Sequence, residues 1–304
     1  MITKVFGIGG IGTGIFFQLN DNRPISRDES RAAVLTDFKD YCKGHIIMHY
    51  VAVLSPSAKV YMLGMVGQDE PGRGLIAEMQ AAGIDTCYLK VTKEAPTMFS
   101  VCYQFPDSAG GNLTASNSAC GLVNPAYINE CAGEIDANSL VLAAPEVPLE
   151  SRIRLMQIGK ERGAVTVASF LSAEAGDFAK AGGFALADII AINADEAWAV
   201  CSNGIESAAR KIMSANPAVK LVITEGKNGS HIFEGGMHAH IPCFPAENVV
   251  STAGAGDAFL GGLVAATIAG KNFKTAAEYG ASAARLSVMS ANTIAETVTV
   301  DALR

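Results

Sequence analysis

Strand and helix patterns alternate through the second half of the chain, and this alternation restricts the fold more than any other feature. Short apolar runs that are typical of buried strands occupy residues 140–143, 165–169, 189–193 and 221–224. Helical patterns separate or follow them at residues 151–162, 207–215, 258–269 and 273–290. Strands that alternate with helices form parallel sheets whose two faces are covered by helices. We therefore predict an α/β fold with a three-layer, Rossmann-like, mostly parallel sheet and helices on both faces.

The first half of the chain adds segments that do not fit a layered core. Strand patterns cover residues 3–8 and 59–66, and helical patterns cover residues 32–54 and 74–82. Residues 97–105 alternate with period 2, as a half-exposed strand does, and polar loops occupy residues 20–31 and 106–118. We predict one domain over residues 1–304, with a small β lid formed by about residues 12–31 and 87–118.

The segment from Ser251 to Gly262 carries the clearest functional pattern. Gly254, Ala255 and Gly256 have almost no side chain, and Asp257 follows them where a helix begins. The first N–H groups of a helix have no partner within the helix, so they can bind an anion. A carboxylate there can accept the proton of a nucleophile that attacks a bound phosphoryl group. The alternative is a glycine-rich helix start in which the macrodipole favours Asp257.

A second polar turn follows the predicted strand at residues 189–193. Asn193 and Glu196 are three residues apart there, and an amide with a carboxylate can hold a hydrated Mg²⁺ and a phosphate oxygen. Taken alone, helix capping is the simpler explanation of the pair. We assign Trp198, in the helix expected after Glu196, to the core.

A third turn, with Thr224, Gly226 and Gly229, follows the strand at residues 221–224. It suits either a backbone that passes close to a nucleotide or an ordinary hairpin turn. Ligands of parallel sheets bind beyond the carboxyl ends of the strands. We therefore expect this turn, Asn193 and the start of the helix at Asp257 to converge at one edge of the sheet.

In order and spacing, these turns resemble the motifs of the ribokinase-like (PfkB-type) carbohydrate kinase family. The N-x-x-E motif matches at Asn193, T-x-G-x-x-G at Thr224, and D-T-x-G-A-G-D, with Ser at its first position, at Ser251–Asp257. An earlier G-x-D-x-x-G matches at Gly67, Asp69 and Gly72, so the resemblance runs from about residue 59 to the end.

The resemblance implies a ribokinase-like fold and a phosphotransferase with an alcohol group as acceptor. Such a carbohydrate kinase uses ATP and Mg²⁺ to phosphorylate a hydroxymethyl group of a sugar, nucleoside or related polyol. By resemblance, Asp257 is the catalytic base, and the N–H groups of Gly254, Ala255 and Gly256 form an anion hole.

The resemblance also implies the residues that bind the cofactors. Asn193 and Glu196 would organise Mg²⁺, through water, together with the phosphates. Thr224, Gly226 and Gly229 would lie along the nucleotide.

The chain departs from the family at three places. Ser251 stands where many members have an Asp that helps to bind a monovalent cation, so we expect activity to depend only weakly on K⁺. The usual N-terminal G-x-x-x-x-D has no acid here, because Thr13 and Gly14 follow Gly9 at that distance. The G-G-x-x-x-N patch is reduced to residues 43–49.

Substrate-binding residues are therefore assigned from what remains. Gly10 and Gly44 would let substrate approach the backbone, and His49 and Asn112 would reach its hydroxyl groups. His45 and His49 are four residues apart, as metal ligands on a helix are, but no acidic or Cys partner lies nearby in the sequence. A packed or surface role remains the alternative for His49, and a loop role for Asn112.

Two other functions compete with a kinase. Gly7, Gly9 and Gly12 form a literal G-x-G-x-x-G after a strand, which is the fingerprint of a Rossmann dinucleotide-binding enzyme. That fingerprint needs a following helix and a second strand that ends in an acid, and no such strand precedes Asp28. A non-catalytic ligand-binding relative of the same fold is the other alternative, favoured by the altered N-terminal motifs.

Composition restricts the partners. A net charge of −7 argues against nucleic acid or an anionic membrane as a partner. Seven scattered cysteines without a C-x-x-C pair indicate free thiols in a reducing compartment, and no signal peptide pattern precedes the first strand. We expect a cytoplasmic protein that acts on a small molecule. Pairing of two copies through the lid is one interpretation of its oligomeric state.

Overall fold

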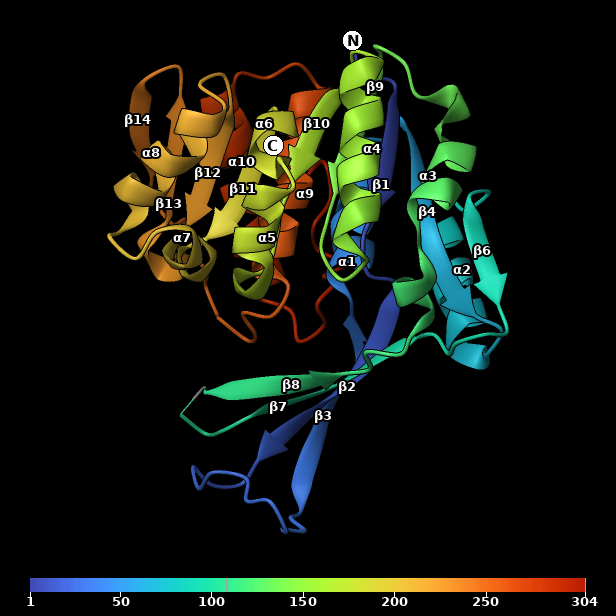
Figure 1. Ribbon diagram of the computed structural model, residues 1–304. Helices are drawn as coiled ribbons and strands as arrows, with labels where there is room; N and C mark the ends of the chain where they lie inside the picture. Colours follow the sequence, from blue (N-terminus) through green and yellow to red (C-terminus); the bar gives the residue numbers. More distant parts are fainter. Residues whose placement is uncertain (108, 304) are drawn as a thin grey trace.

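The computed structural model describes residues 1–107 and 109–303, and its main feature is a ten-stranded sheet (Figure 1). Its strands are β1 (Lys4–Ile8), β4 (Lys59–Gly67), β5 (Ile84–Asp85), β6 (Leu89–Thr92), β9 (Ser139–Ala143), β10 (Val165–Ala168), β11 (Ile189–Asn193), β12 (Lys220–Thr224), β13 (Ser230–Glu234) and β14 (Met237–Ile241). The spatial order is β14-β13-β12-β11-β10-β9-β1-β4-β5, and β6 also pairs with β4. Among these ten strands, the pairs β12–β13 and β13–β14 are antiparallel, and the other pairs are parallel.

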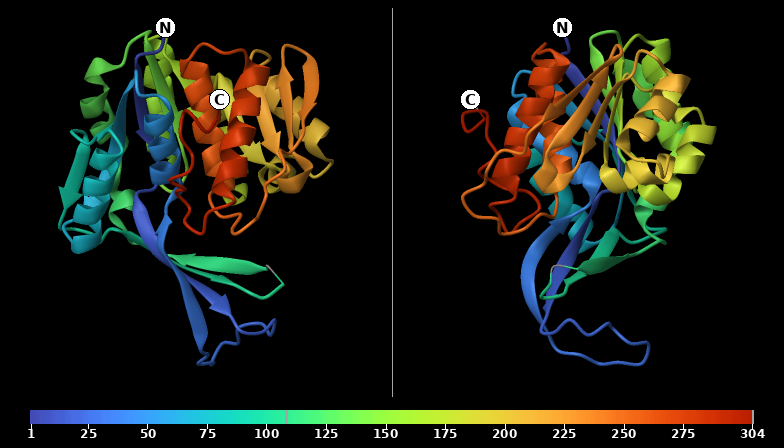
Figure 2. Two further views of the ribbon diagram at one scale, coloured as in Figure 1. Left: turned by 180° about the vertical axis from the view of Figure 1, so that it is seen from behind. Right: turned by 90° about the vertical axis from the view of Figure 1, so that its left-hand side faces the viewer.

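Helices cover both faces of this sheet, as Figures 1 and 2 show. One face carries α1 (Lys43–Leu54), α2 (Glu70–Ala81), α9 (Ala255–Ile268) and α10 (Phe273–Ser287). The other carries α3 (Pro125–Cys131), α4 (Leu149–Glu161), α5 (Ala175–Lys180), α6 (Gly183–Leu186), α7 (Ala194–Val200) and α8 (Ile205–Ala215). The short 3₁₀ helices are η1 (Ala119–Leu122), η2 (Ala132–Glu134), η3 (Ser172–Glu174) and η4 (Gly226–Asn228). The predicted three-layer α/β fold is confirmed.

The core lies between the sheet and these two helical layers. The central strands are apolar on both faces because both are covered, so Val5, Leu63, Leu142, Ile190 and Val222 are fully buried. The parallel pairs β1–β9, β9–β10 and β11–β12 are joined over four or five residues each, and β10 pairs with β11 over two. The carboxyl ends of these strands therefore lie along one edge of the sheet.

A second, four-stranded sheet projects beyond that edge (Figure 1). Its strands are β2 (Gly12–Leu19), β3 (Ala33–Tyr41), β7 (Met98–Gln104) and β8 (Gly110–Thr114), in the order β3-β2-β7-β8. The chain enters this small sheet directly from β1 and leaves it directly into α1. Within the segment expected for the lid, β6 instead pairs with β4 of the main sheet.

Three expectations from the sequence are wrong, wholly or in part. The helix predicted over residues 32–54 is confirmed over Lys43–Leu54, which form α1, but Ala33–Tyr41 form strand β3. Residues 33–36 alternate between half-buried and exposed against β2. The loop predicted over residues 106–118 contains β8, whose exposed residues pair with β7. Trp198 is not in the core: its side chain is 61% exposed on α7.

The glycine fingerprint at Gly7, Gly9 and Gly12 does not open a helix. It leads directly into strand β2, so the dinucleotide-binding alternative lacks the helix N-terminus that would hold a pyrophosphate. Among the described residues, no helix combines the length and apolar character needed to cross a membrane.

Candidate active site

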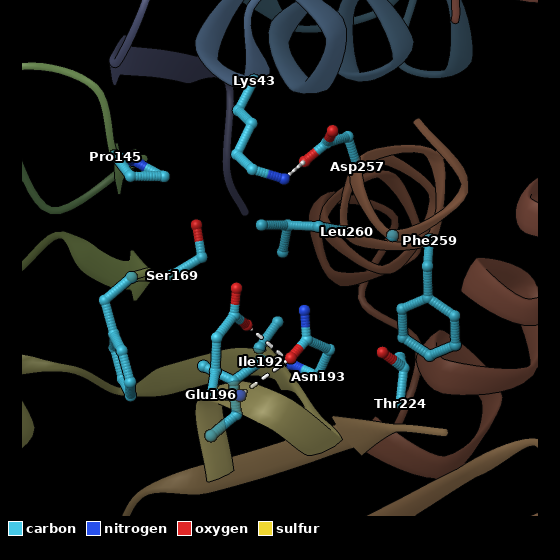
Figure 3. A pocket seen from close by; sticks show the side chains of 13 residues that line it. Lys43, Pro145, Ser169, Ile192, Asn193, Glu196, Thr224, Asp257, Phe259 and Leu260 are labelled. Atoms are coloured by element: carbon cyan, nitrogen blue, oxygen red, sulfur yellow. Dashed lines mark hydrogen bonds and ion pairs between the residues drawn. The ribbon is translucent and has the colours of Figure 1, made fainter. Parts of the chain in front are cut away.

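A pocket lies at the carboxyl edge of the main sheet, where several turns meet (Figure 3). Asn193 and Thr224 end the neighbouring strands β11 and β12 and are paired in register, which brings them together. Ser169 follows β10, and Pro145 follows β9 two residues on. The pocket is lined by Lys43, Pro145, Ser169, Phe170, Ala191, Ile192, Asn193, Glu196, Thr224, Gly256, Asp257, Phe259 and Leu260.

The first turn of α9 forms one wall of this pocket. Gly254 caps the helix with a left-handed backbone (φ 75°), and no side chain makes the capping hydrogen bond. A Cβ on Gly254 would lie 2.7 Å from the carbonyl oxygen of Thr293, so only glycine fits. Asp257 is 8% exposed and lines the pocket with Gly256, while the N–H of Ala255 donates to the Thr252 carbonyl at 3.3 Å. Gly254 and Ala255 are absent from the pocket lining, so the turn offers the Asp257 carboxylate and the backbone of Gly256 to this space.

Lys43, the first residue of α1, faces Asp257 across the pocket (Figure 3). Its Nζ lies 3.6 Å from Asp257 Oδ1. The Asp257 carboxylate, with smaller contributions from Glu146 and Glu196, raises the pKa of Lys43 above its ordinary value although burial lowers it. A cation that is always charged therefore stands beside the carboxylate and the start of α9.

Asn193 and Glu196 form the reciprocal capping pair that the simpler explanation required. The N–H of Glu196 donates to Asn193 Oδ1 at 2.8 Å, and the N–H of Asn193 donates to Glu196 Oε2 at 2.7 Å. Both residues nevertheless line the pocket, so capping fixes their side chains at its wall.

Glu196 is a buried carboxyl group, 9% exposed. Burial raises its pKa to about 7, against the lowering by the Asn193 N–H and by Lys43. A bound cation would offset this cost of burial, and carboxylate and amide oxygens are the ligands that Mg²⁺ prefers. The residues present therefore fit a magnesium ion held partly through water.

The third turn contributes one residue to the pocket. Thr224 lines it, whereas Gly226 and Gly229 lie in the exposed turn around η4 and are absent from its lining. Gly226 and Gly229 have φ of 55° and 89°, and a Cβ on Gly229 would collide with the Ile241 carbonyl. The turn after Thr224 thus has backbone angles that favour glycine at both positions.

The four predicted substrate residues are dispersed. Gly10 and Gly44 lie where the end of β1 crosses the start of α1, and a side chain on either would collide with Glu146 or with Gly9. His49 packs its ring against His45 and Tyr50 on α1 and does not line the pocket. Asn112 is exposed on β8 of the small sheet and is likewise absent from the pocket lining.

Sequence reasoning did not single out two charged residues: Lys43, which lines the pocket, and Glu146, which contacts the Lys43 backbone. Glu146 Oε2 accepts the Lys43 N–H at 2.9 Å, and Glu146 has a left-handed backbone (φ 73°), rare for a residue with a side chain. The available signal was their position: Lys43 directly precedes Gly44, and Glu146 lies between two prolines just after a strand.

Ser251 and Asp69 have local structural partners. Ser251 Oγ accepts the Ala253 N–H at 3.2 Å, so the side chain supports the turn before α9. Asp69 caps α2 by accepting the Gly72 N–H, and it also accepts from the N–H and hydroxyl of Thr97. The early motif therefore ties α2 to the segment that enters β7.

Comparisons with known proteins agree with this geometry. The sequence profile of the pfkB family carbohydrate kinases matches residues 46–299. The ribokinase of Bacillus subtilis is 29% identical over 257 residues, which cover 84% of each chain. The adenosine kinase of Saccharomyces cerevisiae is 25% identical over 249 residues, covering 76% of this chain and 72% of that one.

The fold is similar to that of solved sugar kinases. The structure of the ribokinase from Giardia lamblia superimposes with a TM-score of 0.86 at 20% identity, over 99% of this chain and 98% of that chain. With the matched profile covering most of the sequence and the motif residues gathered at one edge of the sheet, the chain belongs to the pfkB family of carbohydrate kinases.

Proposed function

We propose that the protein transfers the γ-phosphoryl group of ATP to a hydroxymethyl group of a sugar, nucleoside or related polyol. The observation that carries the proposal is the first turn of α9, where Asp257 and Gly256 enter a pocket beside Lys43 and Glu196. Relatives named ribokinase and adenosine kinase support both acceptor classes.

In the proposed reaction, Asp257 takes the proton of the acceptor hydroxyl as that oxygen attacks the γ-phosphorus. The bond from the γ-phosphorus to its bridging oxygen breaks, and ADP leaves with the electron pair. Lys43 keeps Asp257 ionised before the proton moves, because the ion pair at 3.6 Å favours the carboxylate. The N–H groups from Gly254 to Gly256 would hold the charge on the transferred group, as preorganised dipoles do in phosphoryl transfer.

Asn193 and Glu196 would hold Mg²⁺ in this reaction, through water, and Thr224 would lie along the nucleotide. Mg²⁺ supplies positive charge to the phosphates when bound. The capping bonds at 2.7 and 2.8 Å support this assignment, because they fix both side chains before the cofactor arrives. The dependence of turnover on the Mg²⁺ concentration tests it.

Substrate would be bound from the other side of Asp257. The main-chain N–H of Lys43 donates to Glu146 Oε2 and so holds this carboxylate at the start of α1, which supports a role for Glu146 in orienting hydroxyl groups. Gly10 and Gly44 would contribute through the close backbone crossing. Asn112, on β8, would take part only if the small sheet moves toward the pocket. His49 lies on α1 outside the pocket lining, where its ring packs against His45 and Tyr50, so a packed role suits it better.

The decisive experiment is turnover of ATP against a panel of pentoses, hexoses and nucleosides, with Asp257→Asn as the matched variant. We expect phosphorylation of at least one acceptor, and a loss of about 10²–10⁴-fold in Asp257→Asn. The variant should still bind an unhydrolysable ATP analogue. Near wild-type turnover in Asp257→Asn would remove this residue from the mechanism. No turnover of any acceptor, with ligand binding retained, would favour a non-catalytic relative.

We also propose that two copies of the chain pair through the small sheet. Its edge strands β3 and β8 expose Val34 (54%) and Leu113 (73%), and Phe99 on β7 is 39% exposed. Edge strands with apolar side chains are surfaces that proteins normally cover. The molecular mass in solution tests this proposal.

A further inference from the structure

A fully buried arginine lies behind the pocket wall. Arg152, in the first turn of α4, is 0% exposed. Its Nη1 lies 2.7 Å from Glu174 Oε1 of η3, and its Nη2 donates to the Ser169 carbonyl at 2.5 Å. Nε of Arg152 has no hydrogen-bond partner among the described residues. Burial lowers the pKa of Arg152, while the attraction of Glu174, and more weakly of Glu146, opposes this.

This ion pair contacts the backbone on both sides of the segment that forms the pocket wall after β10. Arg152 holds the carbonyl of Ser169, and Glu174 Oε1 accepts the Leu171 N–H at 2.9 Å. Phe170 lies between these two anchors and stacks on Phe178 at 4.9 Å. Ser169 and Phe170 both line the pocket, and Figure 3 shows Ser169 on the wall beside Glu196.

The same pair also reaches the element that carries Glu196. Glu174 is the last residue of η3, and η3 packs directly against α7, whose first turn contains Glu196. The pair thus contacts the Ser169–Phe170 wall through Arg152 and α7 through η3, with Arg152 fully buried and Glu174 23% exposed.

Stability alone is a weak reason for such a pair. A buried ion pair is often matched or exceeded in stability by apolar residues of similar volume, whereas removal of one partner leaves an uncompensated charge. The pair here contacts two backbone groups on either side of a pocket residue. Its specific contribution is therefore the geometry of that wall.

We propose that Arg152, through Glu174, is a positioning residue that fixes the Ser169–Phe170 wall and α7 for phosphoryl transfer. The kinetic part of this inference rests on the proposed function, and the structural part does not. A displacement of about 1 Å in a reacting group can cost about 10²-fold in rate.

The test neutralises both partners at once, so that no buried charge is left alone. The variant is Arg152→Met/Glu174→Gln. Its matched control is Arg154→Met/Glu161→Gln, which neutralises the exposed ion pair of the same helix, with N···O 3.3 Å. Melting temperature, kcat and KM are measured for both, together with the calorimetric Kd of an unhydrolysable ATP analogue with Mg²⁺.

We expect the buried double variant to melt within a few degrees of the control. Its kcat should fall at least about tenfold, and its affinity for the analogue with Mg²⁺ about tenfold, as for other residues that orient metal-binding groups. Values of kcat and Kd within twofold of the control would overturn the inference. If wild-type protein phosphorylates no acceptor, the proposed function fails, and the calorimetric Kd still decides the positioning role.

If the buried double variant does not fold, Arg152→Lys replaces it. Lysine keeps the charge but cannot donate to Glu174 and to the Ser169 carbonyl from one planar group. We expect kcat or the affinity for the analogue to fall at least about fivefold in this variant, which is less than the loss expected for the double variant. Wild-type values of both in folded Arg152→Lys would equally overturn the inference.

Discussion

Lys43, Asp257 and Glu196 are three ionisable residues of one pocket, and their burial sets how each can act. The Lys43 ammonium group lies 3.6 Å from Asp257. Glu196 makes the two hydrogen bonds of its capping box with Asn193, but no cation of the described residues lies as close to it. Burial raises the pKa of Glu196 to about 7. Two carboxyl groups of one site thus differ in charge balance: Lys43 offsets the charge of Asp257, whereas a bound metal ion would offset that of Glu196.

Replacement of Glu196 by glutamine tests the magnesium assignment. The side-chain carbonyl of glutamine can still accept the Asn193 N–H, so we expect the free energy of unfolding to change by less than about 1 kcal/mol. The Mg²⁺ concentration for half-maximal turnover should rise at least about tenfold, because the charged ligand is lost.

A Mg²⁺ titration of both proteins gives the result. Asp195→Asn, a loss of the same charge in the same turn, is the control and should leave the titration unchanged. If Glu196→Gln needs the same Mg²⁺ concentration as the wild type, the role of Glu196 is helix capping and not magnesium binding.

His45 is a buried imidazole whose two nitrogens have no hydrogen-bond partner among the described residues. Burial lowers the pKa of His45 to about 3, from an ordinary value of 6.5. Below pH 6.5 the unfolded chain therefore binds a proton that the folded protein does not. Stability should fall by up to about 1.4 kcal/mol per pH unit as the pH decreases from 6.5 toward 3.

His45→Leu should reduce this loss on acidification and raise the free energy of unfolding at pH 7 by about 1 kcal/mol, since an unpaired polar ring is removed. Urea denaturation between pH 4.5 and 7.5 measures both effects. His240→Leu, on the exposed strand β14, is the comparison. The same acid slope in His45→Leu and in wild type would contradict the assignment.

At the scale of elements, the start of α9 separates two roles of glycine. Gly254 has φ 75° and no room for a Cβ, whereas a Cβ on Gly256 meets no atom within 4 Å. Gly256 is helical and lines the pocket. Glycine is therefore required by the backbone at Gly254 and by the pocket at Gly256.

Gly256→Ala should consequently stabilise the free protein, by up to about 1 kcal/mol, because alanine is the better helix former. It should also weaken binding of an unhydrolysable ATP analogue and lower turnover, since the methyl group would stand where phosphate is expected. Thermal unfolding and calorimetry measure the two effects. Gly254→Ala is the contrast, because it should lower the free energy of unfolding, which Gly256→Ala should raise. Unchanged analogue binding in Gly256→Ala would mean that this turn does not face the phosphates.

The whole molecule is a layered domain with a small sheet beyond the edge that carries the pocket (Figure 1). The two are joined where β1 continues into β2, where β3 continues into α1, and through the bonds of Asp69 to Thr97 before β7. Within the described part of the chain, the outer strands β3 and β8 each have an unpaired edge. The proposed pairing of two copies would use these edges.

If two copies pair there, Leu113→Lys should weaken the dimer at least about tenfold, because an apolar contact becomes a charge. Light scattering over a range of protein concentrations measures the dissociation constant. Val91→Lys, at an equally apolar and 54% exposed position on β6, is the control. A monomeric wild-type protein, or equal dissociation constants in both variants, would exclude pairing through the small sheet.

The sequence by itself determined the layered fold and the turns at its edge. The apolar runs ending at Asn193 and Thr224, and the glycines before Asp257, specify local backbone conformations, because strand, helix and cap preferences act over a few residues. The parallel sheet then brings the ends of such strands together without further information, and Asn193 and Thr224 are indeed in register.

Only the tertiary structure decided which distant residues meet. Residues 33–41 carry a helical pattern, but pairing with β2 makes them a strand. Lys43 meets Asp257, Glu146 meets the Lys43 N–H, and Arg152 meets Glu174 only after four separate elements have packed. Such contacts depend on long-range packing and on the desolvation that accompanies it, and neither is recorded in the local pattern of the chain.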